Sequence, residues 1–478
     1  MRRRSRLGRF ALLVCCSALG ACSAQSDSEE ATDSASNAAS ASEVSPAGHG
    51  GHGGRALELR TLSNRADLVS GGDALVEVVL PRHGHTSHLR VRVGGRDVSS
   101  AFARRADGRT TGVITGLADG HNTVVADASG VRGASLTITS HPIGGPVISG
   151  AQIQPFVCAT PVARPQDGDT PATNASGLGT EAIDAQCNIA TEIKLYYRTT
   201  APGCASVLPD PNPPTPPPAS GCFKPYDPAA PPPADLAMTT TDAGVTVPYI
   251  VRVERGTLNR GIFDIAVLFD PSIDDPAAGW KATAPQPGWN RKLLYSFGAS
   301  TGQPRRQFRS EQTWTDDVAL SRGFMVAINS MTDSLYNSNR VAMVETLMMM
   351  KEHIGDTYGE IRYTIGNGCS GGSINQLTAA SIYPGLLDGI QPTCTYPDSE
   401  TTGIEVADCE LLVRLYAGPD WQALMMSSGR SQAQQNAVKA AINGHRDQTG
   451  CHAWFNSFAA VGRPGNFIPE AVLDNTTG

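Results

Sequence analysis

Aromatic residues are few, and basic residues do not outnumber acidic ones, in this sequence of 478 residues. Aromatic side chains make up 6% of the chain and hydrophobic side chains 40%, so any core must consist mainly of aliphatic residues. The formal net charge of −7 at pH 7 argues against a nucleic-acid partner, because binding to phosphates needs a basic surface. The sequence contains no P-loop, no dinucleotide-binding fingerprint and no clear metal-ligand cluster, so we predict no cofactor.

The apolar run near the N-terminus, residues 10–21, is about a dozen residues long, which is too short to span a bilayer. A cluster of arginines precedes it, which is the layout of a secretory signal peptide. The run ends in LGAC, which resembles the bacterial lipobox, whose cysteine carries lipid after cleavage. We therefore predict a signal peptide over residues 1–21 and a lipid anchor on Cys22, so that the chain is exported to the cell envelope. An ordinary signal peptide with a chance cysteine is the alternative.

The remaining cysteines are compatible with export. After removal of the signal peptide and lipidation of Cys22, an even number of cysteines is left, which predicts disulfides in an exported chain. Proximity in the sequence predicts the pairs Cys158–Cys187 and Cys204–Cys222. The pairing of the other four is open: Cys369, Cys394, Cys409 and Cys451.

Changes in composition divide the chain. Residues 22–54 are rich in Ser, Ala, Glu and Gly, and we interpret them as a disordered tether. Residues 55–145 contain short alternating runs separated by Gly-rich turns, which predicts a small β-sandwich. Residues 146–245 contain proline tracts and the predicted disulfides, which is typical of a connector. Five histidines are interpreted as solvated rather than metal-binding: His49, His52, His83, His85 and His88.

Buried strands alternate with helices in residues 246–478. The apolar runs at 291–300, 323–331 and 362–368 are typical of buried strands. Between the last two, residues 339–359 carry apolar positions at helical spacing, and we interpret the methionines there as helix core. This alternation predicts an α/β fold with a mostly parallel sheet.

The sequence Gly-Cys-Ser-Gly-Gly at residues 368–372 fits the pattern G-x-S-x-G. It follows a predicted strand and begins a predicted helix, which is the context of a nucleophile elbow. The turn is so sharp that Gly368 and Gly372 must be small, and it pushes Ser370 outward beside a helix N-terminus. We predict that Ser370 is a catalytic nucleophile; a Gly-rich structural turn is the alternative.

A serine nucleophile that attacks a carbonyl also needs an oxyanion hole. One donor should be the backbone N–H of Gly371, directly after the nucleophile. The second should come from the loop after the strand at 291–296, where Gly298 or Ala299 is the candidate. An ordinary glycine turn at that loop is the alternative.

The CSGG segment resembles the elbow of tannases and feruloyl-esterase-type hydrolases. The wider sequence is similar to a family of exported bacterial proteins (DUF6351) related to esterases and 3-hydroxybutyrate-oligomer hydrolases. This resemblance covers most of the chain from residue 57 onward and implies an α/β-hydrolase fold and ester hydrolysis. In tannases the cysteine beside the serine is bonded to a cysteine beside the catalytic histidine. Cys369 matches the first half of this device, and Cys451-His452 partly resembles the second. The similar stretches are LSNRADLVSGGDALVEV, GTLNRGIFDIAVLFDP, IGNGCSGGSINQ and PTCTYPDSETTGIEVADC.

A serine nucleophile needs a histidine base and an acid that orients it, in the chain order serine, acid, histidine. Only His445 and His452 follow Ser370. Much of the sequence after residue 393 reads as a helical lid, and no pair of apolar strands follows it. Either His452 or His445 is the base in a short arrangement, or the sheet is C-terminally incomplete and the acid and histidine lie elsewhere. The acid candidates within this sequence are Asp398, Asp408, Asp420 and Asp447.

We therefore predict an exported serine hydrolase that cleaves a small or oligomeric carboxylic ester through an acyl-enzyme on Ser370, with His452 as the candidate base. The membrane is a partner only through the lipid anchor. The alternative is a non-catalytic envelope lipoprotein whose hydrolase fold is decayed or truncated.

Overall fold

The structure is a computed structural model. It describes eight stretches of the chain: 56–81, 88–161, 178–202, 222–276, 279–396, 398–444, 451–452 and 455. Among the residues so described, no helix has the length and apolar character needed to cross a membrane. Several predictions fall outside these stretches: the signal peptide, the anchor at Cys22, the tether, Cys204, His445, Asp447, and His49, His52, His83 and His85.

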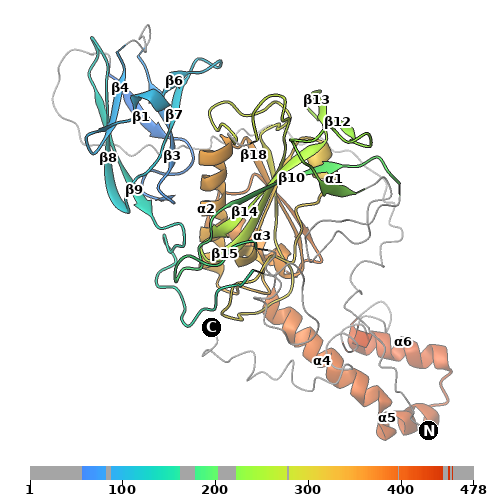
Figure 1. The fold of residues 1–478 in the computed structure, drawn as a ribbon. Helices are drawn as coiled ribbons and strands as arrows, with labels where there is room; N and C mark the ends of the chain where they lie inside the picture. The colour runs from blue at the N-terminus through green and yellow to red at the C-terminus, as the bar shows by residue number, and fades with distance from the viewer. Residues whose placement is uncertain are drawn as a thin grey trace, which may run out of the picture. The chain divides into compact units, whose positions relative to one another are not determined.

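Two small sheets form the N-terminal part of the described chain (Figure 1). Two strands of the second sheet, at residues 90–93 and 134–141, alternate between more and less buried side chains, because successive residues of a strand point to opposite faces. The buried side chains of both sheets share one aliphatic core, which includes Val76, Val91 and Ile138. The boundaries 55–145 stay a prediction. The first sheet has the order β1 (Glu58–Thr61), β3 (Ala74–Val79), β7 (Thr110–Ile114), β6 (Ala103–Arg104). The second has the order β2 (Val69–Ser70), β9 (Ala134–His141), β8 (Gly120–Asp127), β4 (Arg90–Val93), β5 (Arg96–Asp97).

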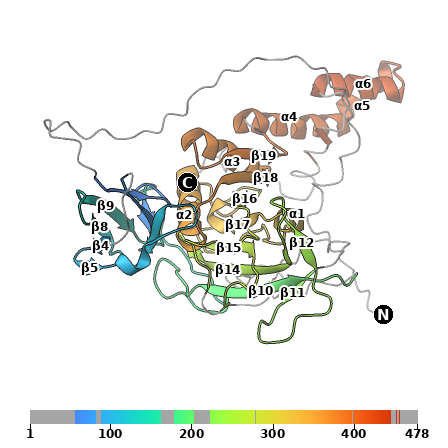
Figure 2. The same ribbon diagram turned by 90° about the horizontal axis from the view of Figure 1, so that it is seen from above.

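An eight-stranded sheet carries the remainder of the fold, and Figure 2 shows most of its strands in order. Its order is β11 (Phe223–Pro225), β10 (Glu192–Arg198), β14 (Ile250–Leu258), β15 (Gly261–Leu268), β17 (Met325–Asn329), β16 (Lys292–Ser296), β18 (Tyr363–Cys369), β19 (Gly389–Thr393). The last four strands in this order are parallel, and the other neighbours are antiparallel. The sheet is therefore mixed rather than mostly parallel. A separate ribbon pairs β12 (Met238–Thr240) with β13 (Thr246–Pro248).

A tight turn explains one antiparallel part of the large sheet. Strands β14 and β15 are joined by only Asn259 and Arg260, and Leu258 pairs with Gly261. Both turn residues have positive φ, 48° and 67°, which is the backbone of a type I′ hairpin turn. A two-residue turn can join only antiparallel strands, whereas parallel neighbours need a longer crossover.

Helices supply the crossovers between the parallel strands. Helix α1 (Asp317–Ser321) lies between β16 and β17 in the sequence, α2 (Arg340–Tyr358) between β17 and β18, and α3 (Gly371–Ile382) between β18 and β19. Helices α2 and α3 pack on the face of β16 that carries Tyr295, and α1 packs on the face that carries Leu294. Within residues 398–444, three helices follow the sheet: α4 (Ser399–Ala417), α5 (Pro419–Ser427) and α6 (Gln432–Asn443).

Helix α2 is buried along most of its length. Asn339 caps its N-terminus, with a side chain that accepts hydrogen bonds from Val341 N and Ala342 N. Gly359, with φ 110°, caps its C-terminus. The run Met348–Met350 is buried, which confirms its interpretation as helix core. Burial of each such side chain stabilises the fold by about 1.5–3 kcal/mol.

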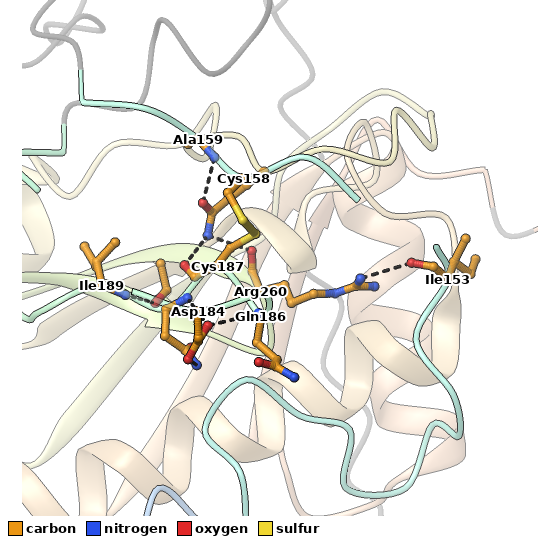
Figure 3. The surroundings of a disulfide bond; sticks show 11 residues. Ile153, Cys158, Ala159, Asp184, Gln186, Cys187, Ile189 and Arg260 are labelled. Carbon is orange, nitrogen blue, oxygen red and sulfur yellow. Dashed lines mark hydrogen bonds between the residues drawn. A yellow bond between two sulfur atoms is a disulfide. The ribbon is translucent and has the colours of Figure 1, made fainter. Parts of the chain in front are cut away.

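Two disulfides lie among the described residues. Cys158–Cys187 confirms the predicted pair, and Cys409–Cys451 is one of the pairings that the sequence left open. Figure 3 shows that the first disulfide lies beside Arg260, whose Nη1 donates to Ile153 O at 3.0 Å. The disulfide therefore fixes the connector next to the β14–β15 turn.

Removal of this disulfide tests its structural role. The double variant Cys158→Ser/Cys187→Ser is expected to lose about 2–4 kcal/mol of unfolding free energy, because the unfolded chain regains entropy. Urea denaturation without reductant measures the loss. Cys394→Ser, at an exposed position, is the control and should change stability by less than about 0.5 kcal/mol. Equal stability of the double variant and the wild type would contradict the assignment.

Candidate active site

Ser370 lies at the sharp turn between β18 and α3, in the predicted strand–turn–helix context. Its backbone has φ 55° and ψ −118°, a left-handed conformation that a residue with a Cβ atom rarely adopts. Hydrogen bonds hold this conformation: Ser370 N donates to Thr393 O at 3.0 Å, and Ser370 O accepts from Ser373 N at 2.9 Å. The side chain is partly exposed, so that its hydroxyl is positioned at the carboxyl edge of the sheet.

The glycines around Ser370 are required by close backbone contacts. A Cβ atom at Gly368 would lie 2.7 Å from Phe297 O, and one at Gly372 would contact the same carbonyl even more closely. A Cβ atom at Gly371 would collide with Ser300 O. Because these neighbours are backbone atoms, they cannot rotate away. The segment 297–300 is thus packed directly against the elbow.

The two predicted oxyanion donors differ in the structure. Gly371 is the first residue of α3, where a helix N–H has no acceptor within the helix, and no partner for it occurs in the described part of the chain. Gly298 N instead donates to Asp333 Oδ1 at 2.8 Å, so this donor is already occupied. Ala299, the alternative candidate, has no backbone partner for its N–H within the described stretches.

Asp333 fixes the segment that carries Gly298. Asp333 was not among the site residues predicted from the sequence. This buried carboxylate accepts hydrogen bonds from Gly298 N, Ser310 Oγ and Glu311 N, each at 2.8 Å. Burial raises the pKa of Asp333 to about 7, although the three donors act in the opposite direction. Its position soon after β17, at the edge where α/β sheets bind ligands, is a signal that could have identified it.

Arg340 is a second residue of this region that was not predicted from the sequence. It is the first residue of α2, and its Nη1 donates to Ser334 Oγ at 3.3 Å and to Asn375 Oδ1 of α3. Asn375 Nδ2 in turn donates to Thr332 O at 2.9 Å. Burial lowers the pKa of Arg340. A cation therefore links the N-terminal ends of two helices beside the elbow.

The proposed base and acids are not brought to Ser370 by any hydrogen bond among the described residues. His452 follows Cys451, which is bonded to Cys409 in α4 and packs with Val413. Cys451 is thus not bonded to Cys369, so the disulfide that the tannase resemblance implies is wrong for this pair. Asp398 caps α4 by accepting from Thr401 N at 3.1 Å. The two other described acid candidates are exposed: Asp408 and Asp420.

Known proteins resemble this chain at the level of a family. A model of the tannase-like family of unknown function (DUF6351) matches residues 59–477. None of the curated proteins matches.

Three solved structures share weaker similarity. Tannin acyl hydrolase from Aspergillus niger is similar over 36% of this chain and 33% of its own, with 10% identity and a TM-score of 0.25. Oligopeptidase B from Leishmania major is similar over 73% of this chain and 50% of its own, with 10% identity and a TM-score of 0.20. Oligopeptidase B from Trypanosoma brucei, with covalently bound antipain, is similar over 70% of this chain and 48% of its own, with 11% identity and a TM-score of 0.18. The chain spans a third to a half of these proteins.

Backbone strain at Ser370 is testable by comparing two variants that both lack the hydroxyl. Ser370→Gly should be more stable than Ser370→Ala by about 1 kcal/mol, because glycine adopts φ 55° without a Cβ clash. Thermal or urea unfolding measures the difference. At exposed Ala437 in α6, the order should reverse, and Ala437→Gly should lower stability. Equal stability of Ser370→Ala and Ser370→Gly would contradict backbone strain at this position.

The buried carboxyl group predicts a pH dependence. The pKa of Asp333 in the folded protein, about 7, lies above its ordinary value of 3.8, so the folded state binds this proton more tightly. The stabilisation from Asp333 is therefore fully present below about pH 4 and decreases as the pH rises to 7. Asp333→Asn should destabilise the protein more at pH 5 than at pH 8, by about 1–3 kcal/mol in urea unfolding. Asp119→Asn, at an exposed position, is the control; a pH-independent effect of Asp333→Asn would contradict the assignment.

Proposed function

Because this chain belongs to the tannase-like family of unknown function DUF6351, we propose that it is a serine hydrolase that cleaves carboxylic esters through an acyl-enzyme on Ser370. The family match over residues 59–477 supports hydrolase activity. The observation that carries the finer proposal is the strained backbone of Ser370, with φ 55°, between a parallel strand and a helix N-terminus. This is the geometry in which G-x-S-x-G presents a nucleophile.

The sheet supports an α/β-hydrolase fold for this domain. The strand order β14-β15-β17-β16-β18-β19 places the elbow strand β18 between two parallel neighbours. Helices on both faces cover the sheet, as in other α/β folds. The elbow then lies at the carboxyl edge of the strand next to the edge strand β19, where a substrate can reach it.

The chemistry follows from the charge that develops during acyl transfer. Ser370 Oγ attacks the ester carbonyl and loses its proton to a base, for which His452 remains our candidate. The N–H groups of Gly371 and Ala299 are proposed to stabilise the oxyanion, and the N-terminus of α3 adds positive potential. The alcohol leaves, and water then hydrolyses the acyl-enzyme.

Export and lipid anchoring at Cys22 are part of the same proposal. The disulfides Cys158–Cys187 and Cys409–Cys451 are compatible with an oxidising compartment outside the cytoplasm. The second candidate function is the non-catalytic envelope lipoprotein. It is favoured by one observation: within the described stretches, no histidine is hydrogen-bonded to Ser370.

Covalent labelling distinguishes the two candidates. The wild-type protein should react with a fluorophosphonate probe and hydrolyse 4-nitrophenyl acetate, and Ser370→Ala should lose the label and at least about 10³-fold in kcat/KM. In-gel fluorescence and absorbance assays measure the two effects.

Ser373→Ala is the matched control, because Ser373 is the next serine along the chain but donates its hydroxyl to Ser370 O at 2.7 Å. It should keep the label. His452→Gln should lose labelling if His452 is the base. An unlabelled wild type, or a Ser370→Ala variant that is still labelled, would overturn the proposed nucleophile.

A further inference from the structure

Arg340 is partly buried and has no carboxylate partner among the described residues, whereas several buried arginines in strands of the eight-stranded sheet have one. Three of these arginines form ion pairs: Arg198 with Asp317 at 2.8 Å, Arg252 with Glu254 at 3.4 Å, and Arg255 with Asp264 at 2.6 Å. The hydrogen bonds described for Arg340 go only to a hydroxyl and an amide oxygen. A partly buried cation without a counter-charge is costly, because burial removes water that would otherwise stabilise it.

Helix dipoles increase this imbalance. Arg340 is the first residue of α2, where the partial positive charge of the helix end repels a cation. Its other contact, Asn375, lies in the first turns of α3, so a second positive helix end is close to the guanidinium. An anion at this position would therefore be attracted by Arg340 and by both helix ends.

The guanidinium has hydrogen-bond donors left for a ligand. Arginine carries five N–H donors, and both described hydrogen bonds of Arg340 use Nη1. Within the described stretches, no nitrogen of Arg340 is both fully buried and without a hydrogen-bond partner. The remaining donors therefore face solvent. The planar arrangement of these donors suits the two oxygens of a carboxylate.

Only the side chain of Ser334 separates the guanidinium of Arg340 from the elbow. Ser334, which accepts from Arg340, packs against Gly371, and a Cβ atom at Gly371 would lie 2.7 Å from Ser334 Oγ. The segment after β19 approaches the same region, because Thr395 Oγ1 lies 3.1 Å from Ser373 Oγ. A ligand on the guanidinium would therefore lie close to Ser370.

We propose that Arg340 binds a carboxylate of the ester substrate, so that the enzyme acts on acidic esters in preference to neutral ones. This inference rests on the proposed ester hydrolysis at Ser370 and adds the substrate class. The carboxylate belongs either to the acyl group or to the alcohol, and two substrate pairs distinguish these sources.

The experiment compares each acidic ester with its neutral methyl ester. The acyl-side pair is 4-nitrophenyl hydrogen adipate and 4-nitrophenyl methyl adipate; the alcohol-side pair is 4-acetoxybenzoate and methyl 4-acetoxybenzoate. For one pair, the wild type should favour the acidic ester about 10-fold or more in kcat/KM, as expected for a charge-assisted hydrogen bond. Arg340→Gln should bring this ratio close to 1, and Arg340→Lys should keep part of it.

Arg414→Gln is the matched control, because it removes the same charge from an exposed position in α4 and should leave the ratio unchanged. A cooperative thermal transition of Arg340→Gln confirms that it is folded. An acidic-to-neutral ratio near 1 in the wild type for both pairs, or a ratio that Arg340→Gln does not change, overturns the proposal.

Binding without turnover separates this inference from the proposed function. In the Ser370→Ala background, adipate should raise the melting temperature, and this shift should vanish with Arg340→Gln added. Wild-type protein that hydrolyses no ester refutes the proposed function, whereas an Arg340-dependent adipate shift still supports the carboxylate site. An equal shift with and without Arg340, or no shift, refutes the site.

Discussion

Two backbone segments approach each other at the elbow more closely than side chains would allow. The carbonyl of Phe297 occupies the space that Cβ atoms at Gly368 and Gly372 would need. The chain can turn from β18 into α3 only where the residues two before and two after Ser370 lack side chains, and Ser370 itself takes φ 55°. The glycines, the strain at Ser370 and the position of the neighbouring loop therefore all depend on this one contact.

The loop on the other side of that contact is fixed by a buried polar group, the carboxyl group of Asp333, rather than by apolar packing. Asp333 accepts from Gly298 N, Ser310 Oγ and Glu311 N, which connects two parts of the loop region to the segment after β17. Apolar contacts alone could not set the orientation of these donor groups, because hydrophobic contacts are not directional. The hydrogen bond from Gly298 N to Asp333 occupies this N–H group. Asp333 therefore determines whether Gly298 or Ala299 is available as the second oxyanion donor.

Local signals allowed the elbow to be predicted, and long-range contacts explain what was missed. Ser370 and its glycines lie within five consecutive residues, and the periodicity of α2 is contained in one segment. The contact of Arg340 with Asn375 joins residues 35 positions apart, and the bond of Asp333 to Gly298 also spans 35. No pattern in the sequence identifies such partners. The sequence indicates a strand pair within residues 246–270, but no local pattern shows that this pair joins β17, so the prediction of a mostly parallel sheet did not include the antiparallel part.

Two unfavourable features lie in one region: a strained backbone at Ser370, and a cation without a carboxylate partner among the described residues at Arg340. Each lowers stability, and mutation readily removes such a feature when no function requires it. In a decayed fold, glycine at 370 or a neutral side chain at 340 would relieve the strain or the charge. Retention of both beside the partly exposed Ser370 favours the catalytic proposal over the non-catalytic alternative, because functional sites are where local structural rules are broken together.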